Sequence, residues 1–322
     1  MREHWQRWVA FCSEKESPLA IALVRISIGC TLFFTCASPY FAGVWSAIWV
    51  DQSHGGIRNY RNIPWFLELL GGATPEAVES LLWIGMGSAM CLIIGLFGRL
   101  AALLGMIVMN TIAWHNTMAT GGHDDLIANI LWLLVFVPND ITLSLRSKLQ
   151  TGSWLSETPI LSIIRRLLLV QLLIMYGSTG LQKVSVHWVP FGQLDALWYI
   201  LQQPTWGWRN HAFLAPYFFW TQLGTLGTWL FELGAPLLGI LMFWEHGTTR
   251  WYRPTWGQRI VAIIRPRILF AVIGIPMHIG ILLTIDVGPF SYAALSVYWT
   301  LWYRPLTIST TESVEKFPDE TS

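Results

Sequence analysis

The sequence has little charge. Asp, Glu, Lys and Arg make up 12% of its 322 residues, whereas a typical soluble domain has about 25%. Hydrophobic residues make up 53% of the chain and the mean hydropathy is +0.47, which argues against a soluble globular protein. The net charge of +1 provides no basic surface to attract nucleic acid, so we expect no nucleic-acid partner.

Cysteine and the common catalytic motifs are also scarce. The four cysteines form no CxxC pair and no zinc-like Cys/His spacing, so we interpret them as packing residues. No GxSxG, P-loop or GxGxxG motif occurs in a useful context, and we predict no metal site because HxxxH and HxxE spacings are missing. The N-terminus lacks the pattern of a cleaved signal peptide.

Long apolar runs are what the sequence has instead. A membrane helix needs about 20 mainly apolar residues. The pattern predicts an all-α, polytopic integral membrane helical bundle with about eight transmembrane helices. We divide the chain into an amphiphilic N-terminus (1–17), a transmembrane domain (18–304) and a polar tail (305–322) that we expect to be disordered. The candidate spans, of which the fourth is short, are 18–38, 77–97, 99–118, 124–138, 162–182, 217–243, 267–286 and 287–303.

The distribution of Lys and Arg predicts the orientation. If the N-terminus is cytoplasmic and the spans alternate, fifteen basic residues fall in inner segments and four in outer segments. Inner loops of membrane proteins carry such an excess. We therefore predict that both termini are cytoplasmic in a multi-pass protein of the cell membrane, a bacterial inner or plasma membrane, with membrane lipids as partners.

Two opposite charges lie inside predicted spans. Arg25 is about two turns into the first span, and Glu232 is near the middle of the sixth. Charges in a bilayer usually face the bundle interior and pair. We therefore predict a structural ion pair between Arg25 and Glu232, with a proton or substrate relay as the functional alternative.

A second set of polar residues is expected near the outer ends of the spans. His123 and Asp124 open the fourth span, Lys183 closes the fifth, and His278 lies in the seventh. Titratable groups that converge at one depth are a candidate site. Simpler interpretations stay open, because a carboxylate at a helix start can be a cap and a lysine at a helix end can be a snorkelling anchor.

Several stretches resemble one family. The stretch YGSTGLQKVSVHWVPFG (176–192) resembles the tyrosine–glycine–lysine–tryptophan–glycine signature of the HTTM (horizontally transferred transmembrane) proteins, the membrane region of vitamin K-dependent γ-carboxylases. The similarity extends from about residue 8 to 304. Its other parts are LAIALVRISIGCTLFF (19–34), GGHDDLIANILWLLVFVPND (121–140), FELGAPLL (231–238) and MHIGILLTIDVGPFSYAAL (277–295).

The resemblance implies roles for several of these residues. In the carboxylase, the lysine of this motif is the base that starts oxygenation of reduced vitamin K, and Lys183 matches it. His123 matches a histidine that supports this chemistry. The cofactor or substrate implied is a reduced quinone such as vitamin K hydroquinone. The residues expected to bind substrate are His278, Asp124, Tyr176 and Trp188.

The chain departs from the carboxylase in one large way, since only about 18 polar residues follow the last predicted span. Carboxylation of a propeptide-bearing protein is therefore not expected. One hypothesis is an enzyme that acts on a lipid-soluble quinol or an exported peptide at the outer face. A second is a non-catalytic membrane subunit that uses outer segments 39–76 and 183–212 to bind a secreted peptide or small partner protein, as in sporulation-delaying protein systems. A third is a transporter with Arg25 and Glu232 on its path.

Overall fold

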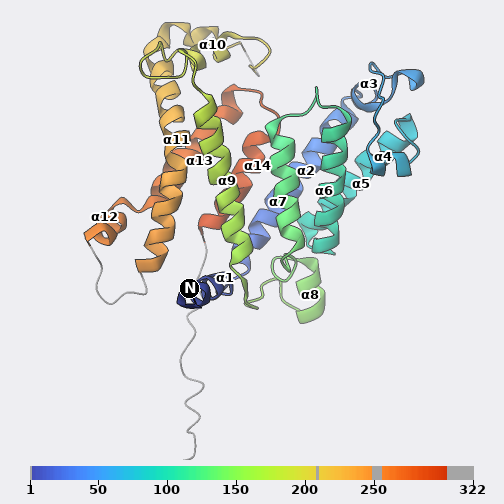
Figure 1. Ribbon diagram of the computed structural model, residues 1–322. Helices are drawn as coiled ribbons and strands as arrows, with labels where there is room; N and C mark the ends of the chain where they lie inside the picture. The colour runs from blue at the N-terminus through green and yellow to red at the C-terminus, as the bar shows by residue number, and fades with distance from the viewer. Residues whose placement is uncertain (1, 208–209, 249–255, 303–322) are drawn as a thin grey trace, which may run out of the picture.

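Helices form most of the structure (Figure 1). The computed structural model describes residues 2–207, 210–248 and 256–302. The predicted polar tail, 305–322, lies outside the described residues. One short antiparallel sheet, β1 (Lys15–Glu16) with β2 (Ile160–Leu161), is present beside the helices. The predicted helical fold class is confirmed at this level.

Within the described residues, five helical segments are long and apolar enough to cross a membrane. They are α2 (Leu19–Phe41), α5 (Pro75–Ile94), α9 (Ile163–Gln182), the segment Ala212–Glu245 that includes most of α11 (Phe218–Thr248), and the segment Arg259–Thr284 that includes α13 (Pro266–Thr284). The other predicted spans coincide with shorter helices. These are α6 (Gly98–His115), α7 (Gly122–Val135) and α14 (Phe290–Tyr298). The count of eight spans and their orientation remain predictions.

The helices form two groups, and α14, which belongs to the second group, also contacts the first. In the first group, α2 contacts α5, α5 contacts α6, and α6 contacts α7. In the second, α9 contacts α11, α11 contacts α13, and α13 contacts α14. Helix α14 also contacts α2, α7 and α9, so it lies between the two groups (Figure 1).

The ends of α5 illustrate how the sequence sets helix boundaries. Thr74 precedes the helix and its side chain accepts a hydrogen bond from the Ala77 N–H, while Pro75 occupies the first turn. Both features favour a helix start. Gly95 ends the helix with φ of +72°, and a Cβ there would lie 2.3 Å from the Ser144 Cβ. Only glycine fits this left-handed and crowded position.

Arg25 does not form the predicted ion pair. Its side chain has no exposed surface, and its guanidinium donates to the backbone carbonyls of Leu92 and, at 2.6 Å, of Leu143. Carbonyls at the C-terminal end of a helix lack intrahelical partners and carry partial negative charge. Arg25 thus satisfies the end of α5 through bonds to backbone carbonyls. Among the described residues, Glu232 pairs with Lys183 instead, so the predicted Arg25–Glu232 pair was wrong.

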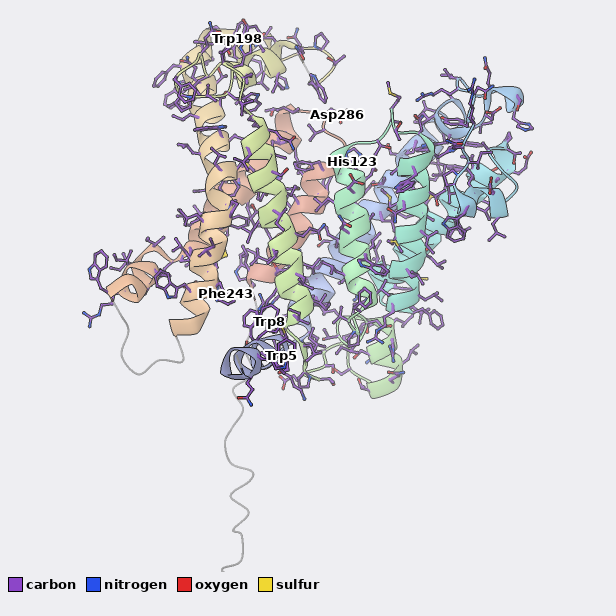
Figure 2. All side chains as sticks on the ribbon, viewed as in Figure 1. Trp5, Trp8, His123, Trp198, Phe243 and Asp286 are labelled. Carbon is purple, nitrogen blue, oxygen red and sulfur yellow. The ribbon has the colours of Figure 1, made fainter. Side chains whose placement is uncertain are left out.

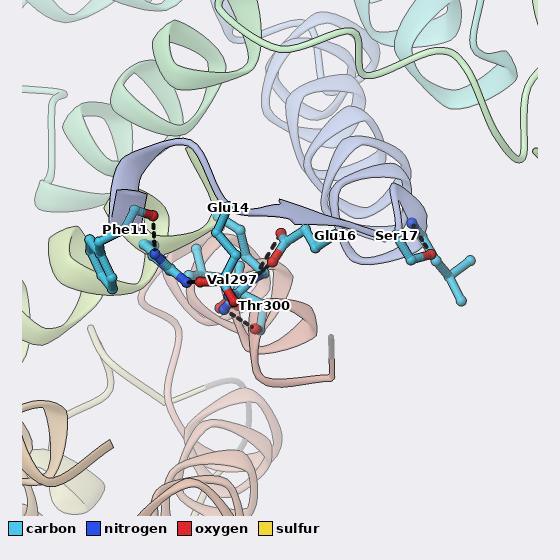
Figure 3. A network of polar contacts seen from close by, with 9 residues as sticks. Phe11, Glu14, Glu16, Ser17, Val297 and Thr300 are labelled. Carbon is cyan, nitrogen blue, oxygen red and sulfur yellow. Dashed lines mark hydrogen bonds and ion pairs between the residues drawn. The ribbon is translucent and has the colours of Figure 1, made fainter. Parts of the chain in front are cut away.

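One end of the bundle is closed by the N-terminal helix α1 (Arg2–Cys12). Arg165 in α9 donates to Glu16 at 2.8 Å and to the Thr300 carbonyl, in η3 (Trp299–Leu301), at 3.1 Å. Arg166 pairs with Glu14 and donates to the Phe11 carbonyl at 2.5 Å (Figure 3). These contacts hold the first and the last described segments at the same end, which we call the α1 end. Its remaining helices are α8 (Leu145–Thr151) and α12 (Trp256–Ile264).

The opposite end carries two folded caps, in the regions that the sequence analysis treats as outer segments 39–76 and 183–212. The first cap contains α3 (Trp45–Trp49), η1 (Gln52–His54) and α4 (Trp65–Leu69). The second contains α10 (Ala196–Gln202) and η2 (Ala212–Tyr217), which lead into α11. We call this the α10 end.

The Asp51 carboxylate binds backbone N–H groups of the first cap, so we expect the stability of this cap to depend on pH. Its carboxylate accepts from the Ser53 N–H at 2.9 Å and the Tyr60 N–H at 2.7 Å, and the bond from Tyr60, followed by those from Ser53, lowers the pKa of Asp51 to about 2. A lowered carboxyl pKa adds stability that is complete above the unfolded-state pKa of about 4 and lost as the pH falls to about 2.

We therefore expect the Ser53 and Tyr60 amides to lose protection from hydrogen exchange between pH 4 and 2, after correction for intrinsic exchange rates. In an Asp51→Asn variant this additional loss should be missing. The same pH-dependent loss in that variant would contradict the assignment to Asp51.

Candidate functional site

Lys183 lies at the end of α9, against α11. Its ammonium contacts the carboxylate of Glu232. The same nitrogen lies 4.8 Å from the centre of the Trp188 ring, over its face. The Lys183 side chain is 21% exposed and that of Glu232 is 9% exposed. A partly accessible amine is therefore held between a buried carboxylate and an aromatic face, an arrangement that favours a cation electrostatically.

Two glycines of the signature stretch let α9 approach α11 closely. A Cβ at Gly177 would lie 2.6 Å from the Pro236 Cγ, and one at Gly180 would lie 2.8 Å from the Leu233 backbone nitrogen. Small residues at helix crossings allow such close contact in membrane proteins. Gly177 and Gly180 thus bring Glu232 to Lys183, and their missing side chains leave no space for a ligand ring.

The segment after Lys183 carries a second acid–base pair, which was not predicted from the sequence. His187 Nδ1 lies 2.7 Å from the Asp195 carboxylate, whose side chain is 7% exposed, whereas that of His187 is 46% exposed. The His187 carbonyl accepts from the Ala196 N–H at 3.1 Å, and Tyr199 meets the imidazole ring edge-on. A carboxylate that orients a histidine fixes the tautomer and position of the ring. The only signal in the sequence was a histidine and an aspartate within one loop.

Tyr176 and His278, both predicted to bind substrate, are joined in the core. The Tyr176 hydroxyl lies 2.5 Å from His278 Nε2 and 3.0 Å from the Tyr298 hydroxyl, while His278 Nδ1 lies 3.1 Å from the Ser291 hydroxyl. All four side chains are at most 2% exposed. The four groups satisfy one another, as buried polar groups must. Their role toward a substrate stays a prediction.

His123 and Asp124 occupy the start of α7. Asp124 accepts from the Gly121 N–H at 2.9 Å, and His123 lies 3.4 Å from the Asp124 carboxylate. Asp124 is therefore a helix cap, the simpler of the two interpretations. The His123 ring lies beside the turn at Gly288, close to Asp286 (Figure 2). Of the described residues, Asp124 is the polar partner of His123 and Glu232 that of Lys183, so no contact joins the two predicted catalytic residues.

The candidate site is thus the α10 end of α9, with Lys183, Glu232, Trp188, His187 and Asp195. Within the described parts of the chain, no group of three or more His, Cys, Asp or Glu side chains could hold a metal ion. The chemistry that these five residues can provide is proton transfer and binding to an aromatic face.

A comparison with protein families gives one match. A family model described as the HTTM domain matches residues 14–205, which is more than half of the chain. The matched range begins at the strand before α2 and ends just after α10, so it includes Lys183 and the loop of the second cap. No curated protein and no solved structure is significantly similar to the chain.

Proposed function

The chain belongs to the HTTM family, and from this premise we propose that it is a membrane enzyme that removes a proton from a lipid-soluble quinol or phenol at the α10 end of the bundle. The observation that carries the proposal is the contact of the Lys183 amine with the Glu232 carboxylate and the Trp188 ring. The five apolar helical segments support a membrane-embedded site.

The proposed step is general base catalysis by Lys183. The Lys183 ammonium first releases a proton to water through its exposed surface. The neutral amine then accepts the hydroxyl proton, so the O–H bond breaks and a new N–H bond forms. The ammonium that results is stabilised by the adjacent Glu232 carboxylate, because two unit charges attract strongly where water is partly excluded.

The residues around Lys183 suit a flat aromatic ring. Trp188 offers a ring face beside the amine, and aromatic pairs stack or meet edge to face. The Lys183 side chain is 21% exposed, so a substrate can reach it. His187, held by Asp195, is 46% exposed and offers a second proton-accepting group on the same cap. A reduced quinone such as vitamin K hydroquinone has a flat aromatic ring, and it would supply the hydroxyl that loses the proton.

The test is the turnover of a defined quinol by purified protein in liposomes. We expect the full-length protein to accelerate the oxidation of phylloquinol by dissolved dioxygen, in which the deprotonated quinol gives two electrons to O2 and yields the quinone and hydroperoxide. Consumption is measured by reversed-phase chromatography, and Lys183→Met should slow it about 100-fold or more, the usual contribution of a general base. The matched control is Lys148→Met, because Lys148 is an exposed-helix lysine at the α1 end that donates to the Gly152 carbonyl. Equal loss in both variants, or no consumption by the unmodified protein, contradicts the proposal.

The second candidate is a non-catalytic subunit that binds a secreted peptide or a small partner protein at the α10 end. The observation in its favour is apolar surface on the second cap, where Phe191 is 88% exposed and Val184 is 76% exposed. Exposed apolar patches often mark interaction sites. A binding subunit would keep its activity with Lys183→Met and lose it with Phe191→Ser, the opposite pattern to the enzyme.

The transporter hypothesis loses the observation on which it was based. It required Arg25 and Glu232 on one path, and these residues have separate partners, the Leu92 carbonyl and the Lys183 amine.

A further inference from the structure

A cavity of about 240 Å³ lies at the α1 end, between α9 and α11. Its walls include Leu173 of α9 together with Met242 and Phe243 of α11, and Trp8 and Phe11 of α1 also line it. Figure 2 shows Trp8 on α1 just below Phe243 on α11. The Phe11 and Phe243 rings meet at 5.0 Å. The cavity is therefore an apolar space whose floor is the N-terminal helix.

Three arginines line this apolar cavity: Arg165 and Arg166 at the start of α9, and Arg267 at the start of α13. Each is held by a carboxylate, since Arg165 pairs with Glu16, Arg166 with Glu14, and Arg267, at 3.3 Å, with Glu245. The Arg166 guanidinium also lies 3.7 Å from the centre of the Phe11 ring. Burial, outweighing the attraction of Arg165, raises the pKa of the Glu16 carboxyl.

The segments around the cavity carry a surplus of positive charge. The described side chains of residues 5–17, 163–167, 239–245 and 256–267, which form or adjoin the cavity, include six basic and three acidic groups. The acidic groups are the three glutamates that pair with the lining arginines, so the described part of these segments has more basic than acidic side chains. The basic side chains are Lys15, Arg165, Arg166, Arg259, Arg265 and Arg267.

We propose that this cavity is a binding site for one acidic phospholipid. An acyl chain fits an apolar cavity between two helices, and a phosphodiester headgroup fits a rim of arginines at the membrane border. A zwitterionic lipid would fill the apolar part equally well but would gain less from the surplus positive charge. This site lies at the opposite end of α9 from Lys183 and does not depend on the proposed enzyme activity.

The position of the site predicts a structural consequence of lipid binding. The cavity is bounded by α1, α9 and α11, so a bound lipid contacts all three elements. The described contacts of α1 with the bundle include the Arg166–Phe11 hydrogen bond and the Phe11–Phe243 ring contact. Any ligand that binds only the folded arrangement stabilises it, and we therefore expect an acidic lipid to favour the docked position of α1.

The test is native mass spectrometry of the delipidated full chain after addition of two lipids with the same acyl chains. We expect the protein to retain phosphatidylglycerol at least fivefold more than phosphatidylcholine. Arg267→Gln should lower the retention of phosphatidylglycerol, because it removes a rim charge whose side chain is 27% exposed. Val170→Trp should also lower it by filling the mouth of the cavity, where Val170 is 46% exposed.

The matched control is Arg99→Gln, which removes an exposed arginine at the same end of the bundle, outside the cavity lining. Its retention of phosphatidylglycerol should equal that of the unmodified protein. The two substituted positions are independent and at least partly exposed, so a failure to fold in one variant leaves the other to decide. Equal retention of the two lipids overturns the proposal, as does unchanged retention in both Arg267→Gln and Val170→Trp, or an equal loss in Arg99→Gln.

Discussion

Replacing Lys183 with methionine and Glu232 with glutamine together is expected to give a folded protein that consumes no quinol. The two side chains contact each other, and both are mainly shielded from water, with exposures of 21% and 9%. Removing one charge leaves the other without its partner, whereas removing both leaves a neutral amide beside a thioether. Comparing the single variant with the double variant therefore separates the effect on folding from the effect on chemistry.

The single substitution is expected to be less stable than the double one. Breaking a fully buried ion pair from one side costs about 3–5 kcal/mol, and the partial exposure of Lys183 screens this to roughly 1–3 kcal/mol. The melting temperature of Lys183→Met should thus fall below that of the double variant. Turnover should be lost in both, since neither contains the base.

Lys183→Arg is the most informative companion. Arginine keeps the positive charge opposite Glu232, so the fold should be retained, but a guanidinium is effectively always protonated and cannot accept a proton. We expect a melting temperature close to that of the unmodified protein and no turnover of phylloquinol. A Lys183→Arg protein with normal turnover would show that the residue acts through its charge, as in a binding subunit, and would overturn the assignment of a base.

The positions of the helices could be predicted from the sequence because they depend on local composition. Each of the eight predicted apolar segments coincides with a helix, for example 162–182 with α9 (Ile163–Gln182) and 267–286 with α13 (Pro266–Thr284). The segment 124–138 is short, as the pattern indicated, because α7 spans Gly122–Val135. A long apolar run that enters a membrane finds no water to bind its backbone N–H and C=O groups. It must pair them internally and therefore forms a helix.

The partners of polar residues could not be predicted in the same way. Depth along a span places Arg25 and Glu232 in the membrane region, but it does not specify which helix end or side chain each one faces. Arg25 donates to the carbonyls of Leu92 and Leu143, which are 67 and 118 positions away in the chain. Leu92 lies in the last turn of α5. Backbone carbonyls are partners that a comparison of charged residues does not consider, and they depend on how α2 packs against α5.

The candidate site was predicted in part. The family signature located Lys183 and Trp188, and the structure places them in contact. The pairing of Lys183 with Glu232 was missed because it depends on the α9–α11 crossing, which Gly177 and Gly180 set through three-dimensional contact. His123 was expected beside Lys183 because both lie near one end of the bundle, but α7 and α9 hold these side chains against different partners.

Replacing Arg25 with methionine is expected to destabilise the protein more than Lys183→Met does. The guanidinium is completely buried and donates to the carbonyls of Leu92 and Leu143. Methionine fills a similar apolar volume but removes the charged donor from both carbonyls and leaves that of Leu92 with the Gly95 N–H at 3.2 Å, at about 1–3 kcal/mol for each acceptor. The loss of on the order of 4 kcal/mol should lower the melting temperature by about 10 °C.

The same geometry predicts the outcome of two companion variants. Arg25→Lys should recover only part of the stability, because an ammonium is a point donor and lacks the planar fork that reaches two carbonyls. The charge exchange Arg25→Glu with Glu232→Arg should not rescue folding, since a carboxylate at position 25 would face the carbonyl oxygens at the end of α5. Scanning fluorimetry in detergent measures all three. Recovery of the melting temperature in the charge-exchange variant would show that Arg25 and Glu232 pair after all. No recovery in that variant, together with partial recovery in Arg25→Lys, identifies Arg25 as the cap of α5.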